Sequence, residues 1–151
     1  MTPSGGVLEP ESSGAELGLG DFFQPNEQHW QENRFDIADQ PDVQGMAAVS
    51  QGCGGSYYSR TLELRLSNSF ERLTFKVGQA NDSESSDQEL TVEVLANNEQ
   101  VEIRQVPFNQ IQEFEIPVSS VNALKIQTYL NPDNPDCQGS VIGVVHDVSV
   151  S

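Results

Sequence analysis

Two runs of alternating apolar and polar residues within positions 57–78 limit what this chain can fold into. A period of two places the apolar side chains on one face of a strand and the polar side chains on the other. A short polar segment separates the two runs, so we predict a β-hairpin with one face in water. The apolar members are Leu62, Leu64 and Leu66 in the first run, and Leu73, Phe75 and Val77 in the second.

A second hairpin is predicted further along the chain. Residues 89–95 alternate and lead into Asn97-Asn98, and Val101 and Ile103 continue on the return strand. Asparagine tolerates the positive φ angles that a two-residue hairpin turn requires. The Asn-Asn pair is therefore expected to form the turn.

Three more segments complete the expected sheets. They are a strand with Phe114 and Ile116 that ends at Pro117, a strand with Leu124 and Ile126, and residues 141–150. The last run is mostly apolar, as is typical of a buried central strand. Seven or eight short strands without a helical period predict an all-β fold, a jelly-roll-like β-sandwich.

The N-terminal third has a different composition. Residues 1–16 are expected to be a linker or disordered segment, and residues 17–151 a single sandwich domain. Positions 17–23 are a candidate first strand, whereas residues 24–56 have no sustained period and predict loops. Core contacts are expected there from Phe35, Ile37 and residues 46–49.

The charge excludes some partners. Acidic residues number 23 against 7 lysines and arginines, giving a net charge of −16. Such a field repels phosphates, which disfavours nucleic acids and anionic lipid surfaces and leaves cations, neutral glycans and basic proteins. The alternative is that the charge only keeps a secreted domain soluble. No apolar run approaches the roughly 20 residues of a membrane span, so no insertion is expected from this segment.

Two cysteines, Cys53 and Cys137, lie in segments rich in Gly, Pro or Asp. We predict a disulfide between them, which implies an oxidising, extracytoplasmic compartment. The alternative is two free loop thiols, and zinc is disfavoured because neither has a CxxC or nearby histidine partner. The chain has no signal sequence, so as a whole protein it would be cytosolic. Because the predicted disulfide implies export, we expect instead a segment excised from a larger secreted or membrane-anchored protein.

Three strand patterns in the second half of the chain follow one another in a recognisable order: Phe70, Phe75, Val77 and Gly78; then Val92, Val94 and Leu95; then Ile116, Val118, Leu124 and Ile126. Through these patterns, the chain over about residues 57–151 resembles the NPCBM domain, a carbohydrate-binding module attached to glycoside hydrolases. The resemblance implies a galactose-binding-domain-like sandwich and glycan recognition. Near the final strand, where the family usually carries an Asp-Trp pair, this chain has His146-Asp147.

Sugar-binding modules stack an aromatic ring on the apolar face of a sugar and surround it with polar groups. The candidate ligand-binding residues are therefore Trp30 and Tyr129, with Asn131 and Asp133 beside them. The alternative for Trp30 is that its ring packs at one end of the sandwich.

Acidic loops offer oxygen ligands for calcium, with Asp82 and Asp87 as the first candidates and Asp133 and Asp136 as the second. The spacing matches no EF-hand, and the alternative is a hydrated loop. No other cofactor is implied.

Catalysis has little support, because the chain has only 2 histidines and no nucleophile elbow. We therefore expect a non-catalytic domain, extracellular or at the cell surface, that recognises a glycan or another cell-envelope component. The alternative is a sensor or protein-interaction ectodomain of a membrane signalling protein without a sugar site. The missing tryptophan near the last strand and the negative charge favour this alternative.

Overall fold

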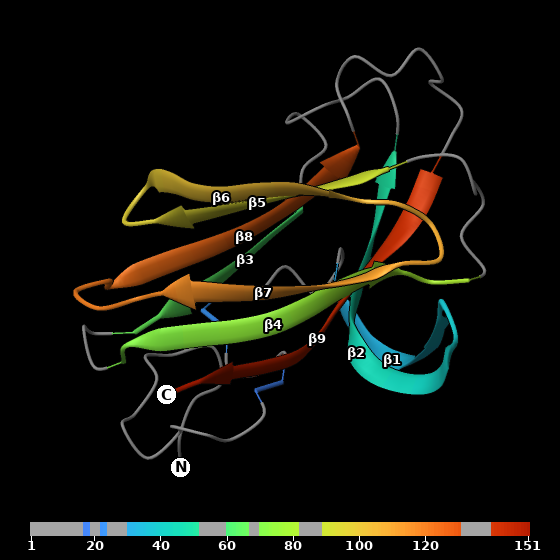
Figure 1. Cartoon of the computed structure of the whole chain (residues 1–151), viewed down its shortest axis with the longest axis horizontal. Coiled ribbons are helices and arrows are strands. Elements are labelled where there is room, and N and C mark those ends of the chain that lie inside the picture. Colours follow the sequence, from blue (N-terminus) through green and yellow to red (C-terminus); the bar gives the residue numbers. More distant parts are fainter. Residues whose placement is uncertain are drawn as a thin grey trace.

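The computed structural model describes residues 17–18, 22–23, 30–51, 60–66, 70–81, 89–130 and 140–151, and these contain nine strands and no helix (Figure 1). None of these residues forms a helix that is long and apolar enough to cross a membrane. The strands are β1 (Gln31–Ile37), β2 (Gln40–Gln51), β3 (Arg60–Arg65), β4 (Arg72–Gln79), β5 (Leu90–Ala96), β6 (Glu99–Val106), β7 (Ile111–Pro117), β8 (Ala123–Leu130) and β9 (Ser140–Val150).

The strands form two antiparallel sheets that pack face to face. One sheet has the order β1-β2-β9-β4-β7 and the other has the order β3-β8-β5-β6. Their inner faces meet in one apolar core, in which the rings of Phe75 and Phe114 stack with centroids 4.7 Å apart. Burying a Leu or Phe side chain stabilises a fold by about 1.5–3 kcal/mol, so this core holds the sheets together. The predicted β-sandwich is confirmed.

The first predicted hairpin is wrong. Strands β3 and β4 do bury Leu62 and Leu64, and Leu73 and Phe75, but β3 pairs with β8 while β4 pairs with β7 and β9 in the other sheet. Both sheets of a sandwich need an apolar inner face, so alternation identifies the buried face of a strand without identifying its partner.

The expectation of loops over residues 24–56 is also wrong, because β1 and β2 form a hairpin there. Strand β1 is an edge strand, and most of its side chains are exposed on both faces. It therefore needs no alternation, and the sequence pattern did not reveal it. Ile37 and Met46 are buried as expected, whereas Val49 is 44% exposed.

Other predictions about the strands are confirmed. Asn97 and Asn98 have φ angles of 50° and 70° and connect β5 to β6, and β7 ends at Pro117. Strand β9 lies in the centre of the five-stranded sheet. Of the predicted strand at 17–23, the described residues are not in a strand, although Leu17 N donates to the Val148 carbonyl at 2.7 Å.

The β1–β2 hairpin curls back over the outer face of its own sheet (Figure 1). At its tip Ile37 forms a bridge with Ala80, just beyond the end of β4. Gly78 permits this approach, since a Cβ atom there would lie 2.4 Å from Ile37 Cγ2. The curl creates a second group of buried side chains, the outer apolar cluster, which contains Ile37, Ala47, Ala80 and Val144.

Candidate ligand-binding site

Several strands begin or end together at one end of the sandwich. Gln51 at the end of β2 pairs with Ser140 at the start of β9, and Arg60 at the start of β3 pairs with Thr128 near the end of β8. Binding residues of β-sandwiches often lie where loops join such strand ends. This end of the sandwich is therefore a candidate location for a binding site.

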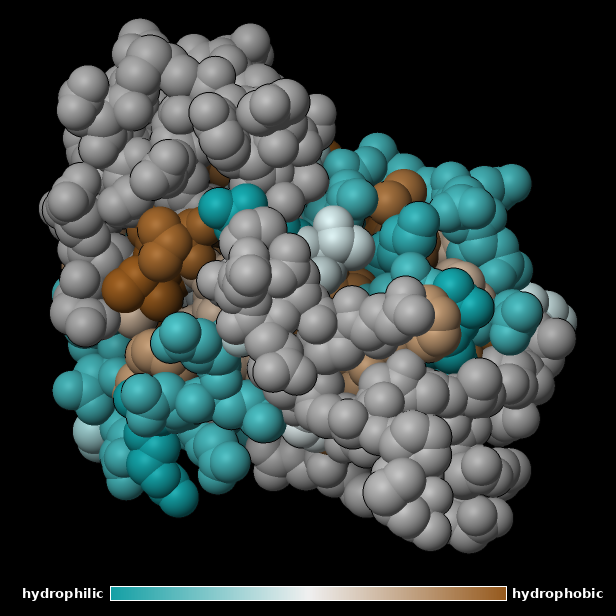
Figure 2. Space-filling view, turned by 180° about the vertical axis from the view of Figure 1, so that it is seen from behind, coloured by the Kyte–Doolittle hydropathy of each residue, from teal (hydrophilic) through white to brown (hydrophobic). Residues whose placement is uncertain are grey.

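An apolar hollow of about 260 Å³ lies beside these strand ends. Its apolar lining includes Phe35 of β1, Val49 of β2 and Ile142 of β9, and Val49 and Ile142 are cross-strand partners. The side chains of Gln31 and Arg60 add polar groups to the lining. Seen from behind, the molecule carries exposed apolar patches among hydrophilic side chains (Figure 2). The hollow thus combines an apolar floor with two polar groups.

Arg60 connects the two sheets at the hollow. Its backbone belongs to β3, while its Nε donates a hydrogen bond of 3.1 Å to the carbonyl of Val49 in the other sheet. This bond fixes one edge of the guanidinium. The terminal nitrogen atoms are not used by it and can serve a ligand.

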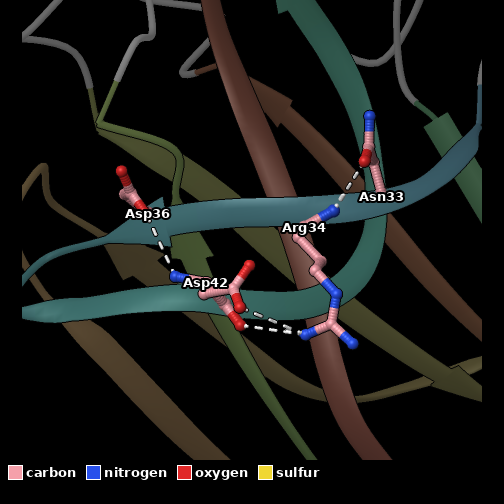
Figure 3. Close-up of polar contacts among 4 residues, drawn as sticks. All are labelled: Asn33, Arg34, Asp36 and Asp42. Atoms are coloured by element: carbon pink, nitrogen blue, oxygen red, sulfur yellow. Dashed lines mark hydrogen bonds and ion pairs between the residues drawn. The ribbon is translucent and has the colours of Figure 1, made fainter.

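Polar contacts brace the hairpin that carries Gln31 and Phe35. Arg34 reaches from β1 to Asp42 on β2, with Nη1 3.5 Å from Oδ2, and the Asp42 amide donates to Asp36 Oδ1 at 3.0 Å (Figure 3). Asp42 has a φ of 58° in this bent part of the strand. Successive side chains of a strand point to opposite faces, so Arg34 lies on the face opposite to Gln31 and Phe35.

A polar groove of about 630 Å³ lies further along the outer face of the same sheet. Its floor includes His146, Lys76 and Glu113, which are consecutive cross-strand neighbours on β9, β4 and β7. Asp147 Oδ2 lies 3.5 Å from Lys76 Nζ and 3.3 Å from His146 Nδ1. Asp147 already pairs with Lys76, and the lining includes no Phe, Tyr or Trp ring, so the groove fits a sugar less well than the hollow does.

Trp30, a sequence-predicted ligand-binding residue, is buried. It is 1% exposed, packs in the core, and donates from Nε1 to the carbonyl of Thr61 at 3.2 Å. This agrees with the alternative, in which the ring packs into the sandwich. A platform for sugar stacking needs an exposed face, and Trp30 does not offer one.

Tyr129 is 9% exposed, and its hydroxyl donates to Glu93 Oε1 at 3.0 Å. Burial, followed by the hydrogen bond to Glu93 and its negative charge, raises the pKa of Tyr129 to about 12. The hydroxyl is therefore held protonated by an intramolecular acceptor. Its ring presents little surface to a ligand.

The remaining predicted site residues lie outside the described residues, and their roles stay predictions. They are Asn131 and Asp133, the calcium candidates Asp82, Asp87 and Asp136, and the cysteines Cys53 and Cys137. Among the residues that the structure does describe, no group of three or more His, Cys, Asp or Glu side chains could hold a metal ion.

The sequence did not identify Gln31, Phe35 and Arg60 as site residues, and Phe35 was expected only as a core contact. The hollow exists only because β1 pairs with β2 and because β3 lies in the opposite sheet, and neither relationship was predicted. A usable signal was present in the alternation of Gln31, Asn33 and Phe35 with charged residues, although three positions are few for an assignment.

No protein-family model and no curated protein sequence matches the chain, so its likeness to the NPCBM family stays a resemblance. Solved structures do match. The first is CBM51 from Clostridium perfringens GH95 in complex with methyl-galactose, with a TM-score of 0.59, 12% identity and 95% of each chain covered.

A second match is the M60 catalytic domain with the CBM51-1 and CBM51-2 domains from Clostridium perfringens ZmpB. It has a TM-score of 0.56 and 13% identity, and covers 80% of this chain but only 12% of that one. At such low identity these likenesses establish the fold alone. The chain therefore has the jelly-roll-like sandwich of these carbohydrate-binding modules.

Proposed function

We propose that this domain is a non-catalytic glycan-binding module and that the apolar hollow holds a sugar ring. The observation that carries the proposal is the presence of Gln31 and Arg60 beside a floor of Phe35, Val49 and Ile142. The fold is shared with a module solved in complex with methyl-galactose. That likeness supports the class of ligand and does not identify the sugar.

The chemistry of the hollow suits a carbohydrate. A pyranose has an apolar face of C–H groups, which packs on aliphatic and aromatic side chains, and a rim of hydroxyl groups that need hydrogen-bond partners. The Gln31 amide donates and accepts, and the Arg60 guanidinium donates. A volume of about 260 Å³ is just below the usual range of small-molecule pockets, which suits a ligand as small as one sugar ring.

A glycan array with two matched variants tests the proposal. Val49→Asp places a charge on the apolar floor and should reduce retention of the bound glycan about tenfold or more, because an apolar contact is replaced by a hydrated carboxylate. Val101→Asp is the control, since Val101 is similarly exposed, at 47% against 44% for Val49, but lies on β6 in the other sheet. Retention of no glycan by the wild type, or equal losses in both variants, contradicts the proposal.

The sequence-predicted site at the end of β8 is the competing location. Asn131→Ala and Asp133→Ala should leave binding nearly unchanged if the hollow is the site. Loss of binding in these two variants, with Val49→Asp unaffected, places the sugar on the loop after Tyr129 instead.

We further propose that the domain works outside the cytoplasm, at the cell surface or in the extracellular space. The proposal rests on the predicted Cys53–Cys137 disulfide, and the strand ends nearest to these cysteines, Gln51 and Ser140, are paired. Thiol titration of the unfolded, unreduced protein should detect no free thiol. Two titratable thiols remove the argument for an oxidising compartment.

Calcium binding at Asp82 and Asp87 remains a separate proposal from loop composition. A calcium site filled well above its dissociation constant raises the melting temperature by mass action. An identical melting temperature in millimolar calcium and in chelator contradicts it.

A protein-interaction ectodomain is the rival function. A basic protein partner attracted by the charge of −16 should associate more slowly as salt is added, whereas a neutral glycan should respond little. Salt-sensitive capture of a protein, together with an empty glycan array, favours the rival.

A further inference from the structure

We infer that the sugar bound in the apolar hollow carries a carboxylate and that Arg60 recognises it. The inference rests on the proposed glycan-binding function and names the class of ligand: an acidic saccharide of the uronic-acid type. It departs from the expectation of a neutral glycan, which followed from the net charge alone.

Pairing of the cations sets Arg60 apart. The chain has only 7 lysines and arginines against 23 acidic residues. In the part of the chain that the structure describes, Arg60 and Lys125 have no carboxylate partner, and Lys125 Nζ contacts the amide oxygen of Asn98 at 3.2 Å. The other cations each pair with a carboxylate: Arg34, Arg65, Arg72, Lys76 and Arg104.

With so many carboxylates available, an arginine without one is positioned for another acceptor. Arg60 lines the hollow, and its contact with the Val49 carbonyl uses only Nε. A guanidinium presents its terminal nitrogen atoms as a planar fork that matches the two oxygen atoms of a carboxylate. The contact between Arg60 and Val49 is exposed, so a ligand in the hollow can reach the terminal nitrogen atoms.

The charge of the whole domain acts against this contact at long range. A net charge of −16 repels an acidic saccharide during approach, whereas the pair with Arg60 forms only at contact. Added salt should therefore increase the association rate of an acidic ligand until screening of the contact itself dominates. A neutral sugar should show no such increase.

The test compares neutral and acidic sugars of the same stereochemistry, D-galactose with D-galacturonic acid and D-glucose with D-glucuronic acid, as monosaccharides in solution and as oligosaccharides on an array. The acidic member of the pair that binds should be favoured about tenfold, the effect of one bidentate charge-assisted contact. Arg60→Gln should remove this preference, because it lowers the affinity for the acidic member more than the affinity for the neutral member. Arg60→Lys, which keeps the charge without the planar fork, should retain part of it.

Lys125→Gln is the matched control, because it removes the other cation without a carboxylate partner, and Lys125, on the neighbouring strand β8, does not line the hollow. It should keep the preference, and equal effects of Lys125→Gln and Arg60→Gln indicate a nonspecific charge effect and contradict the inference. Equal or stronger binding of the neutral sugars overturns the inference and leaves glycan binding standing. Retention of no sugar of either kind overturns the proposed function as well.

Discussion

The side-chain amide of Asn81 forms two hydrogen bonds with the backbone of Ala38, which lies 43 residues earlier in the chain. Nδ2 donates to the Ala38 carbonyl at 3.1 Å, and Oδ1 accepts from the Ala38 amide at 3.0 Å. The Asn81 amide also donates to the carbonyl of Asp36 at 2.7 Å. These bonds join the tip of the β1–β2 hairpin to the segment after β4, and so hold the hairpin that carries Gln31 and Phe35.

Asn81→Ala should destabilise the domain by about 1–2 kcal/mol, because both side-chain hydrogen bonds are lost and each contributes about 0.5–1.5 kcal/mol. Thermal unfolding measures the loss, as a decrease in Tm of roughly 2–4 °C per kcal/mol for a domain of this size. Faster hydrogen exchange at the Ala38 amide should accompany it. Ser119→Ala, at an exposed turn, is the control, and equal effects of the two variants contradict a role for the Asn81 contacts.

Gly78 and Ile37 should show energetic coupling. Gly78→Ala places a methyl group within 2.4 Å of Ile37 Cγ2 and should cost about 1–3 kcal/mol. Ile37→Ala removes that atom, so the double variant should be more stable than the sum of the single losses predicts, by about 0.5 kcal/mol or more. Denaturant unfolding of the four proteins measures the coupling. Strict additivity means that the hairpin does not lie against Gly78.

Adjacent asparagines in the β5–β6 turn should respond in opposite ways to glycine. Asn98→Gly should be neutral or stabilise by up to about 1 kcal/mol, since Asn-Gly is a favoured pair where both residues have positive φ. Asn97→Gly should destabilise by about 1–3 kcal/mol. Its side chain donates to the Ser120 carbonyl at 3.2 Å and accepts from the Asn122 and Ala123 amides at 3.0 and 3.2 Å. Denaturant unfolding measures both changes. Equal changes in the free energy of unfolding for Asn97→Gly and Asn98→Gly contradict the different roles given to the two asparagines.

Tyr129 should ionise later than an ordinary tyrosine, because its pKa is raised from 10.0 to about 12. A pKa that is higher in the folded state than in the unfolded state favours folding below the unfolded value. Stability should therefore fall as pH rises from about 10 through 12. Ultraviolet titration should show one late-ionising phenol that disappears in Tyr129→Phe. Identical titrations of the two proteins contradict the contact with Glu93.

The buried faces of most strands were predictable because burial imposes a local period of two, as in Leu62, Leu64 and Leu66 of β3. Strand partners were not, since pairing depends on long-range contacts that leave no local pattern. The exposed edge strand β1 offered only a short alternation of three positions, too few for an assignment, and the hollow follows from its pairing with β2. A lone buried aromatic such as Trp30 has the same sequence signature as an exposed one, so burial decided its role only in the folded structure.

Binding of a glycan in the apolar hollow can be observed residue by residue in a nuclear magnetic resonance titration. A saccharide retained on the array is added to isotopically labelled protein while the backbone and methyl resonances are followed. A glycan in the hollow should shift the resonances of Gln31, Val49, Arg60 and Ile142 and leave those of Val101 and Ile103 on β6 unchanged. Shifts confined to the polar groove around Lys76 or to the strand end at Tyr129, or no shift with any saccharide, contradict it.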